Sequence, residues 1–214
     1  MIVNQGLNWI ITDHISDLDS IKTVVSDVTS EDWSSYTTAK GPKSRQHYLI
    51  NPSWMPSEAH KEPRGWSDLK VWYENTVSKS LVHHGLLPSQ WNGITAHRAW
   101  TVIGEEGSYH TIHDHGPNSV CSVTYIEVPE QNKNDDKAGQ IYFVLQSDPY
   151  NPLAPVKHKV LHIAPKPGMI VIFPSWILHG VYPQGPGIRQ TLNVDFKGNV
   201  NPGPEDSAGF ISVL

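Results

Sequence analysis

Residues 120–128 read VCSVTYIEV, a short run rich in β-branched residues that ends at a proline. Five other stretches are also short and rich in β-branched or aromatic residues: ITAHRAWTVI (94–103), QIYFVLQ (140–146), HKVLHIAP (158–165), GMIVIF (168–173) and RQTLNVDF (189–196). Most are bounded by Gly, Pro, Asn or Asp, and no helical pattern lies between them. Short strands at such intervals predict an antiparallel sandwich or barrel over about residues 94–197.

The segment before residue 94 has a helical texture. Apolar residues recur there at three- and four-residue steps, at Ile15, Leu18, Ile21, Val25 and Val28. A second helix is expected over 67–84, with Ser67 as its N-cap and Gly85 as its C′ residue. Residues 40–65 between the helices contain four prolines and predict an extended or loop segment. We therefore expect one domain over 1–214, with a helical portion (1–93), a β core (94–197) and a tail (198–214).

The composition excludes several classes of partner. The chain has 214 residues, 17% of them charged, and a net charge of −5, which argues against binding to nucleic acid or to a membrane surface. No apolar run reaches the roughly 18 residues that a membrane span needs. The N-terminus lacks the pattern of a signal peptide, and the single cysteine, Cys121, fits a reducing compartment. A cytoplasmic location is expected.

Residues 110–115 read HTIHDH and place three histidines within six positions. Residues two apart on a strand point to the same face, so His113 and His115 are expected to aim at one point and Asp114 away from it. His110 stands in the opposite register to this pair. Surface histidines are common in β-proteins, so the spacing alone leaves both a metal site and an ordinary polar strand open.

The best candidate for a third ligand is His179, in GMIVIFPSWILHGVYP (168–183). The apolar strand in this segment ends at Phe173, and the histidine follows in the next segment. A His-x-His pair with a remote histidine can supply three ligands on one face of a metal and leave positions for substrate and oxygen. Iron(II) sites of this kind more commonly use two histidines and a carboxylate. Asp114 could take the place of His115 only if a bulge turned it inward.

Arg189 lies ten residues after His179, in a predicted strand. An arginine that projects into a barrel is costly unless it meets an anion, and its planar fork suits a carboxylate. Thr191 shares its strand phase and can add a hydroxyl hydrogen bond, so this pair predicts a carboxylate anchor. The alternative is an exposed arginine that pairs with Asp195 or Glu127.

Three blocks of the chain together resemble one family. AWTVIGEEGSYHTIHDHGPNSVCSVTYIEV (99–128), APKPGMIVIFPSWILHGVYP (164–183) and IRQTLNVDF (188–196) are similar to the bacterial and phage 2-oxoglutarate/iron(II)-dependent oxygenases. The family pattern joins Gly-x-Tyr, His-x-His, a Ser-Gly-Val-Tyr-Tyr-like strand, Pro-x-Gly, Phe-Pro-Ser-x-x-x-His and Arg-x-Ser. The resemblance covers about residues 97–197. It departs at residues 121–125, where one tyrosine is lost, and at Thr191, where threonine replaces serine.

This resemblance implies a mainly β fold, a double-stranded β-helix (jelly-roll, cupin-like) core with N-terminal helices packed on one sheet. It implies iron(II) held by His113, His115 and His179, and 2-oxoglutarate held by Arg189. Tyr125 is a reasonable further contact for the cosubstrate, beside Thr191. Three other residues are candidates for lining the substrate pocket: Tyr109, Asn118 and Trp176.

The expected function is therefore a 2-oxoglutarate- and iron(II)-dependent oxygenase, with hydroxylation of a small molecule or peptide as the default outcome. Two alternatives stay open at this point. One is a cupin-like metal-dependent dioxygenase or isomerase that does not use 2-oxoglutarate, and the other is a non-catalytic jelly-roll binding module. The sequence identifies neither the substrate nor the oligomeric state, for which a homodimer is one option.

Overall fold

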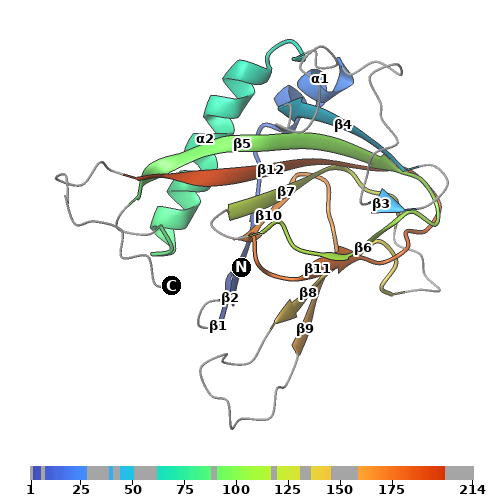
Figure 1. Cartoon of the computed structure of the whole chain (residues 1–214). Coiled ribbons are helices and arrows are strands. Elements are labelled where there is room, and N and C mark those ends of the chain that lie inside the picture. The colour runs from blue at the N-terminus through green and yellow to red at the C-terminus, as the bar shows by residue number, and fades with distance from the viewer. Residues whose placement is uncertain are drawn as a thin grey trace, which may run out of the picture.

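The computed structural model describes residues 2–5, 8–27, 39–40, 44–50, 62–87, 91–116, 120–130, 136–145 and 159–200. Among these residues, two β-sheets face each other, and two helices lie on the outer side of the larger one (Figure 1). The helices are α1 (Leu18–Ser26) and α2 (Trp66–His83). This arrangement is the double-stranded β-helix that the resemblance implied.

Within the described part of the chain the larger sheet has seven strands, and every strand pair in it is antiparallel. In spatial order they are β1 (Ile2–Gln5), β2 (Asn8–His14), β10 (Met169–Pro174), β7 (Val120–Glu127), β12 (Arg189–Val200), β5 (Trp91–Gly104) and β4 (Arg45–Ile50). The smaller sheet contains β3 (Ala39–Lys40), β6 (Tyr109–His113), β11 (His179–Val181), β8 (Ile141–Leu145) and β9 (Lys159–Ile163). The six strands predicted after residue 94 are all present.

The helical prediction for the first third of the chain was incomplete, because β1 and β2 precede the helices and extend the large sheet past β10. On β2, Trp9 and Ile11 join the core under the helices, whereas Ile10 joins the core between the sheets. Both faces of this strand are covered, so its sequence lacks the polar alternation of a half-exposed strand. The segment 40–65, which was expected to be extended or a loop, contains β4 and the last residue of β3.

Helix α2 buries one face against the large sheet. Its buried residues follow the helical period: Trp66, Leu69, Tyr73, Val77 and Leu81. The helix starts one residue before the predicted N-cap, because Gly65 takes a left-handed conformation there (φ 79°) and the Ser67 hydroxyl donates to Glu62 instead. At the other end, Gly85 is the left-handed C′ residue that was predicted, and Leu86 N–H donates to the Leu81 carbonyl (2.8 Å).

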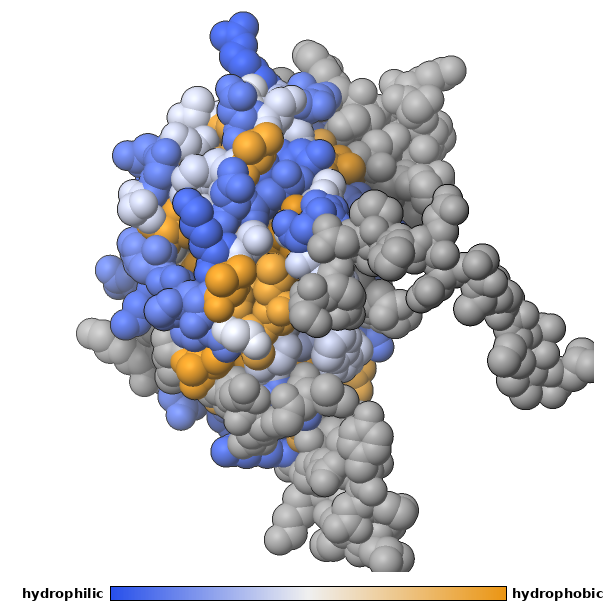
Figure 2. Space-filling view, turned by 90° about the vertical axis from the view of Figure 1, so that its left-hand side faces the viewer, coloured by the Kyte–Doolittle hydropathy of each residue, from blue (hydrophilic) through white to orange (hydrophobic). Residues whose placement is uncertain are grey.

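The core between the two sheets positions the functional site. It is built from residues of both sheets, including Phe143 of β8 and Phe173 of β10, whose rings pack edge to face at 4.9 Å. Seen from the left-hand side of Figure 1, the surface is mostly hydrophilic, with a small apolar group near the middle of that face (Figure 2). In the part of the chain that the structure describes, neither helix is long and apolar enough to cross a membrane.

Candidate metal and cosubstrate site

A cavity between the two sheets gathers polar residues that are far apart in the sequence. Strands β6, β8 and β11 contribute from the small sheet, and β5, β7 and β12 contribute from the large one. The lining residues are Trp100, His110, His113, His115, Val123, Tyr125, Ile141, His179, Val181, Arg189, Thr191 and Asn193. Six of the nine residues predicted for the site are in this set.

The three histidines predicted as ligands converge in this cavity. His113 and His179 are direct cross-strand partners on β6 and β11, and their ring centroids are 4.4 Å apart. The His115 ring is 5.3 Å from that of His113 and 5.1 Å from that of His179. One ligand atom from each of the three lies within 4.8 Å of the others. This spacing is suitable for a shared metal ion.

Each of these imidazoles uses Nδ1 for a hydrogen bond to an oxygen. His113 donates to the Thr111 carbonyl (2.7 Å), His179 to the Ile177 carbonyl (2.9 Å) and His115 to the Asp195 carboxylate (2.8 Å). Carbonyl and ionised carboxylate oxygens only accept, so the proton must be on Nδ1. In each ring, Nε2 is therefore the nitrogen whose lone pair can bind a metal.

The environment favours the neutral form of His113 and His179. Burial, followed by the proximity of His113 and His115, lowers the pKa of His179 to about 3. Burial also lowers the pKa of His113. Asp114, the alternative to His115, is exposed and accepts the Gly116 N–H (3.0 Å), so it does not reach the cluster.

Arg189 enters the same cavity from the start of β12 and is almost fully buried, with 4% of its surface exposed. Its Nη1 has no hydrogen-bond partner among the described residues. The alternative pairings do not form, because Asp195 contacts Arg98 and Glu127 is exposed. The cation is therefore available to an anion that enters the cavity.

Two hydroxyl groups accompany this guanidinium. The Tyr125 hydroxyl is buried without a hydrogen-bond partner among the described residues, and Thr191 lines the cavity in the strand phase of Arg189. Burial raises the pKa of Tyr125 to about 12, although Arg189 acts in the opposite direction. The phenol thus keeps its proton and can donate it in a hydrogen bond.

His110 was not predicted as a site residue, yet it lines the cavity beside Arg189. The reason is a change of register: His179 pairs with His113, but Val181 pairs with His110, so two steps on β11 oppose three on β6. The extra residue turns His110 to the same side as His113, because a one-residue slip reverses the face of a strand residue. Burial, followed by the charge of Arg189, holds the pKa of His110 well below its ordinary range.

Two of the three residues predicted to line the substrate pocket, Tyr109 and Trp176, do not line the cavity. Tyr109 and Trp176 are 38% and 44% exposed, and neither belongs to the lining. Tyr109 precedes His110 and points to the opposite side of β6, which is the physical reason for its exposure. Asn118 lies outside the described residues.

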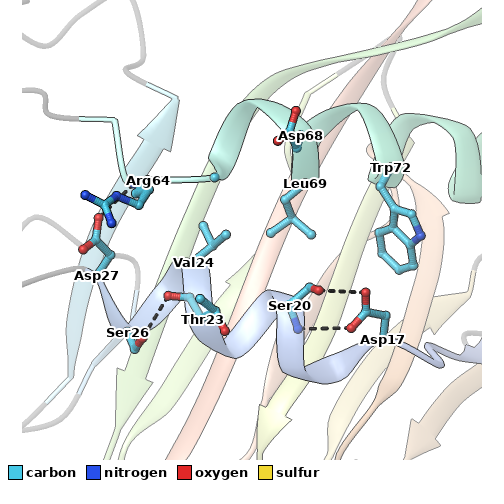
Figure 3. Close-up of a pocket in the computed structure, with 11 residues that line it drawn as sticks. Asp17, Ser20, Thr23, Val24, Ser26, Asp27, Arg64, Asp68, Leu69 and Trp72 are labelled. Carbon is cyan, nitrogen blue, oxygen red and sulfur yellow. Dashed lines mark hydrogen bonds between the residues drawn. The ribbon is translucent and has the colours of Figure 1, made fainter.

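A groove between α1 and α2 lies on the other side of the large sheet. Figure 3 shows Val24, Leu69 and Trp72 within it, and Asp17 hydrogen-bonded to Ser20 at the start of α1. Asp17 acts there as the helix N-cap. This groove has none of the converging histidines of the cavity between the sheets, and we do not assign the chemistry to it.

The comparisons with known proteins agree with this geometry. Residues 98–195 match the family model described as "Putative 2OG-Fe(II) oxygenase". The matched segment contains His113, His115, His179 and Arg189, all of which line the cavity between the sheets. No curated protein sequence matches the chain significantly. Oxygenases of this family use iron(II) and 2-oxoglutarate, so the protein is an iron(II)- and 2-oxoglutarate-dependent oxygenase.

Solved structures of low sequence identity share its fold. A Pseudomonas putida prolyl-4-hydroxylase is 14% identical, with a TM-score of 0.59 over 89% of this chain and 92% of that one. A Trichoplax adhaerens prolyl hydroxylase in complex with a hypoxia-inducible-factor peptide is 17% identical, with a TM-score of 0.52 over 88% and 83%. The carbocyclase SnoK of nogalamycin biosynthesis is 11% identical, with a TM-score of 0.59 over 92% and 84%. At these identities the likeness concerns the fold, and the reaction must be argued from the site.

Proposed function

We propose that the oxygenase binds iron(II) through Nε2 of His113, His115 and His179, binds 2-oxoglutarate through Arg189, and hydroxylates an aliphatic C–H bond of its substrate. The observation that carries this proposal is the shared cavity. A cluster of three histidines and a buried arginine, whose Nη1 has no partner among the described residues, both line it.

The histidine cluster fits a divalent transition metal. Imidazoles are ligands that iron accepts. His113 and His179 lie on adjacent strands of one sheet, and His115 lies two residues after the end of β6. His115 lies beyond the end of β6, where its N–H donates to the Ser175 carbonyl (2.8 Å) and so ties it to the segment before His179. This backbone hydrogen bond helps to hold His115 close to the other two histidines.

The arginine fits the far carboxylate of 2-oxoglutarate. A buried guanidinium loses its hydration, and this cost is offset only by an anion with matching hydrogen bonds. A carboxylate can accept two parallel N–H bonds from the guanidinium, and the Tyr125 hydroxyl is a further buried donor in the same cavity. A cupin-like enzyme without 2-oxoglutarate would have no use for this arrangement.

When bound, iron(II) and 2-oxoglutarate supply the oxidising chemistry: oxygen is activated, the cosubstrate loses carbon dioxide to become succinate, and the substrate gains an oxygen atom. The protein's own residues hold and shelter these groups. Val123, Ile141 and Val181 give the cavity an apolar wall that limits access of water.

The first substrates to test are prolyl peptides, since two of the similar structures are prolyl hydroxylases. The purified protein with iron(II), 2-oxoglutarate and ascorbate would be given a library of proline-containing peptides, and succinate and peptide mass would be measured. A peptide that gains one oxygen atom as succinate forms supports hydroxylation. Metal and 2-oxoglutarate binding without succinate in any condition would favour a non-catalytic binding module.

A further inference from the structure

Asp195 lies at the centre of a buried polar group next to the histidine cluster. It is on β12, where its cross-strand partners are Arg98 of β5 and Cys121 of β7. Its carboxylate is fully buried, with 0% of the residue exposed. A carboxylate in the middle of a seven-stranded sheet is costly to bury, so its contacts require an explanation.

Those contacts converge on His115. Oδ1 of Asp195 accepts the Nδ1–H of His115 at 2.8 Å. Oδ2 lies 2.8 Å from Nη2 of Arg98 in an ion pair that lacks the alignment of a hydrogen bond. The same Nη2 donates to the backbone carbonyl of His115 (3.0 Å). Arg98 therefore contacts both the carboxylate and the residue that the carboxylate holds.

His115 differs from the other two histidines in this respect. His113 and His179 donate Nδ1–H to neutral backbone carbonyls, whereas His115 donates to a charged carboxylate. A hydrogen bond to an ionised acceptor is stronger and increases the basicity of the opposite ring nitrogen. His115 also lacks the support of a strand, since β6 ends at His113.

We propose that Asp195, held by Arg98, is a positioning residue of the metal centre: it fixes His115 in the Nδ1–H tautomer and provides a negative charge that a ligand set of three imidazoles does not contain. This inference rests on the proposed metal site. In iron(II) sites of this kind a carboxylate more commonly binds the metal directly. Here the Asp195 carboxylate instead accepts a hydrogen bond from His115, a proposed ligand. A purely structural role is a poorer explanation, because buried ion pairs can often be replaced by apolar residues without loss of stability.

The test uses the full-length protein and Mn(II) as the probe, without 2-oxoglutarate. Mn(II) affinity would be measured by electron paramagnetic resonance for the wild type, His179→Ala, Asp195→Asn and Glu74→Gln. Glu74 is the matched control, because its carboxylate accepts the Ala96 N–H of β5 (2.8 Å) but lies on α2, outside the cavity. We expect Asp195→Asn to lose about 10- to 100-fold in affinity, the usual effect of an outer partner, and Glu74→Gln to stay within about twofold of the wild type.

A second measurement needs no variant at that position. Long-range ¹H–¹⁵N correlation on metal-free, ¹⁵N-histidine-labelled wild type reports which nitrogen of His115 has the proton, and His115→Gln assigns the signal. The Nδ1–H tautomer is expected, and an Nε2–H tautomer would overturn the inference even if Asp195→Asn fails to fold. If Asp195→Asn binds Mn(II) with an affinity within twofold of the wild type, the inference about Asp195 is overturned but the metal site is not. A wild type that binds no Mn(II), or binds it equally well as His179→Ala, would overturn the metal site and this inference with it.

Discussion

His113 and His179 face each other as direct cross-strand partners, with ring centroids 4.4 Å apart, although 65 positions separate them in the numbering. The pairing of β6 with β11 therefore creates two thirds of the proposed ligand set. Because both Nδ1 atoms donate to backbone carbonyls within the same two segments, the local backbone also determines which nitrogen faces the cavity.

Replacement of His179 by alanine should abolish tight metal binding and leave the fold intact. We expect iron(II) affinity to fall more than about 100-fold, beyond the effect of an outer partner. The control is His162→Ala, since His162 is on β9 of the same sheet but does not line the cavity. Isothermal titration under anaerobic conditions gives the affinities, and thermal denaturation of the metal-free proteins checks the fold. Equal affinities for the two variants would contradict the ligand assignment.

Replacement of Arg189 separates the cosubstrate from the metal. Arg189→Lys keeps a charge but loses the planar fork, and Arg189→Met removes both. We expect 2-oxoglutarate affinity to fall by at least about tenfold in each variant, more in Arg189→Met, while Mn(II) affinity stays within about threefold. Parallel losses of both affinities would instead indicate a structural arginine.

Arg189 should also lower the free energy of unfolding of the protein when no 2-oxoglutarate is bound. Its buried guanidinium has a nitrogen without a partner among the described residues, so Arg189→Met should raise the free energy of unfolding by about 1–3 kcal/mol. Urea denaturation of the metal-free proteins measures this difference. A destabilised Arg189→Met protein would show that the guanidinium serves the fold.

Tyr125→Phe removes one buried hydroxyl and little volume. Because this hydroxyl has no partner among the described residues, its loss should leave the unfolding free energy nearly unchanged or slightly higher. The affinity for 2-oxoglutarate should fall about 2- to 10-fold, as expected for one hydrogen bond. Unchanged 2-oxoglutarate affinity would remove Tyr125 from the proposed cosubstrate contacts.

His110→Phe tests the residue that the bulge turns inward. His110 lines the cavity near Arg189 but does not belong to the three-histidine cluster. We expect metal affinity to stay within about threefold, and the KM for 2-oxoglutarate or substrate to rise about 2- to 10-fold through loss of a hydrogen bond. A loss of metal affinity comparable to that of His179→Ala would assign His110 to the metal centre instead.

The sequence predicts the β core well for a physical reason. Each strand after residue 94 is a separate run of β-branched and aromatic residues with turn residues at its ends, so local preference and global fold agree. The face of α2 is equally predictable, because its buried residues follow the helical period. Strand β2 was missed because both of its faces are buried, which removes the alternation that identifies a strand.

The site is predictable only where local phase determines it. His113 and His115 share a face, and Arg189 and Thr191 share another, as their spacing indicates. His110 was missed because a bulge against β11 reverses its face, and no local pattern marks that bulge. From the sequence, Asp195 was considered only as a possible ion-pair partner of Arg189. Its contact with His115 depends on the register of β5, β12 and β7, which no local pattern shows.

The most direct test of the central claim is an anaerobic titration of the metal-free protein with iron(II) and then 2-oxoglutarate, followed by visible absorption. The proposed site predicts a weak charge-transfer band that saturates at one iron and one 2-oxoglutarate per chain. The band should be absent from His179→Ala and should require much more 2-oxoglutarate in Arg189→Lys. A wild-type protein that binds iron(II) but develops no such band with 2-oxoglutarate would contradict the proposal that the histidines and Arg189 form one active site.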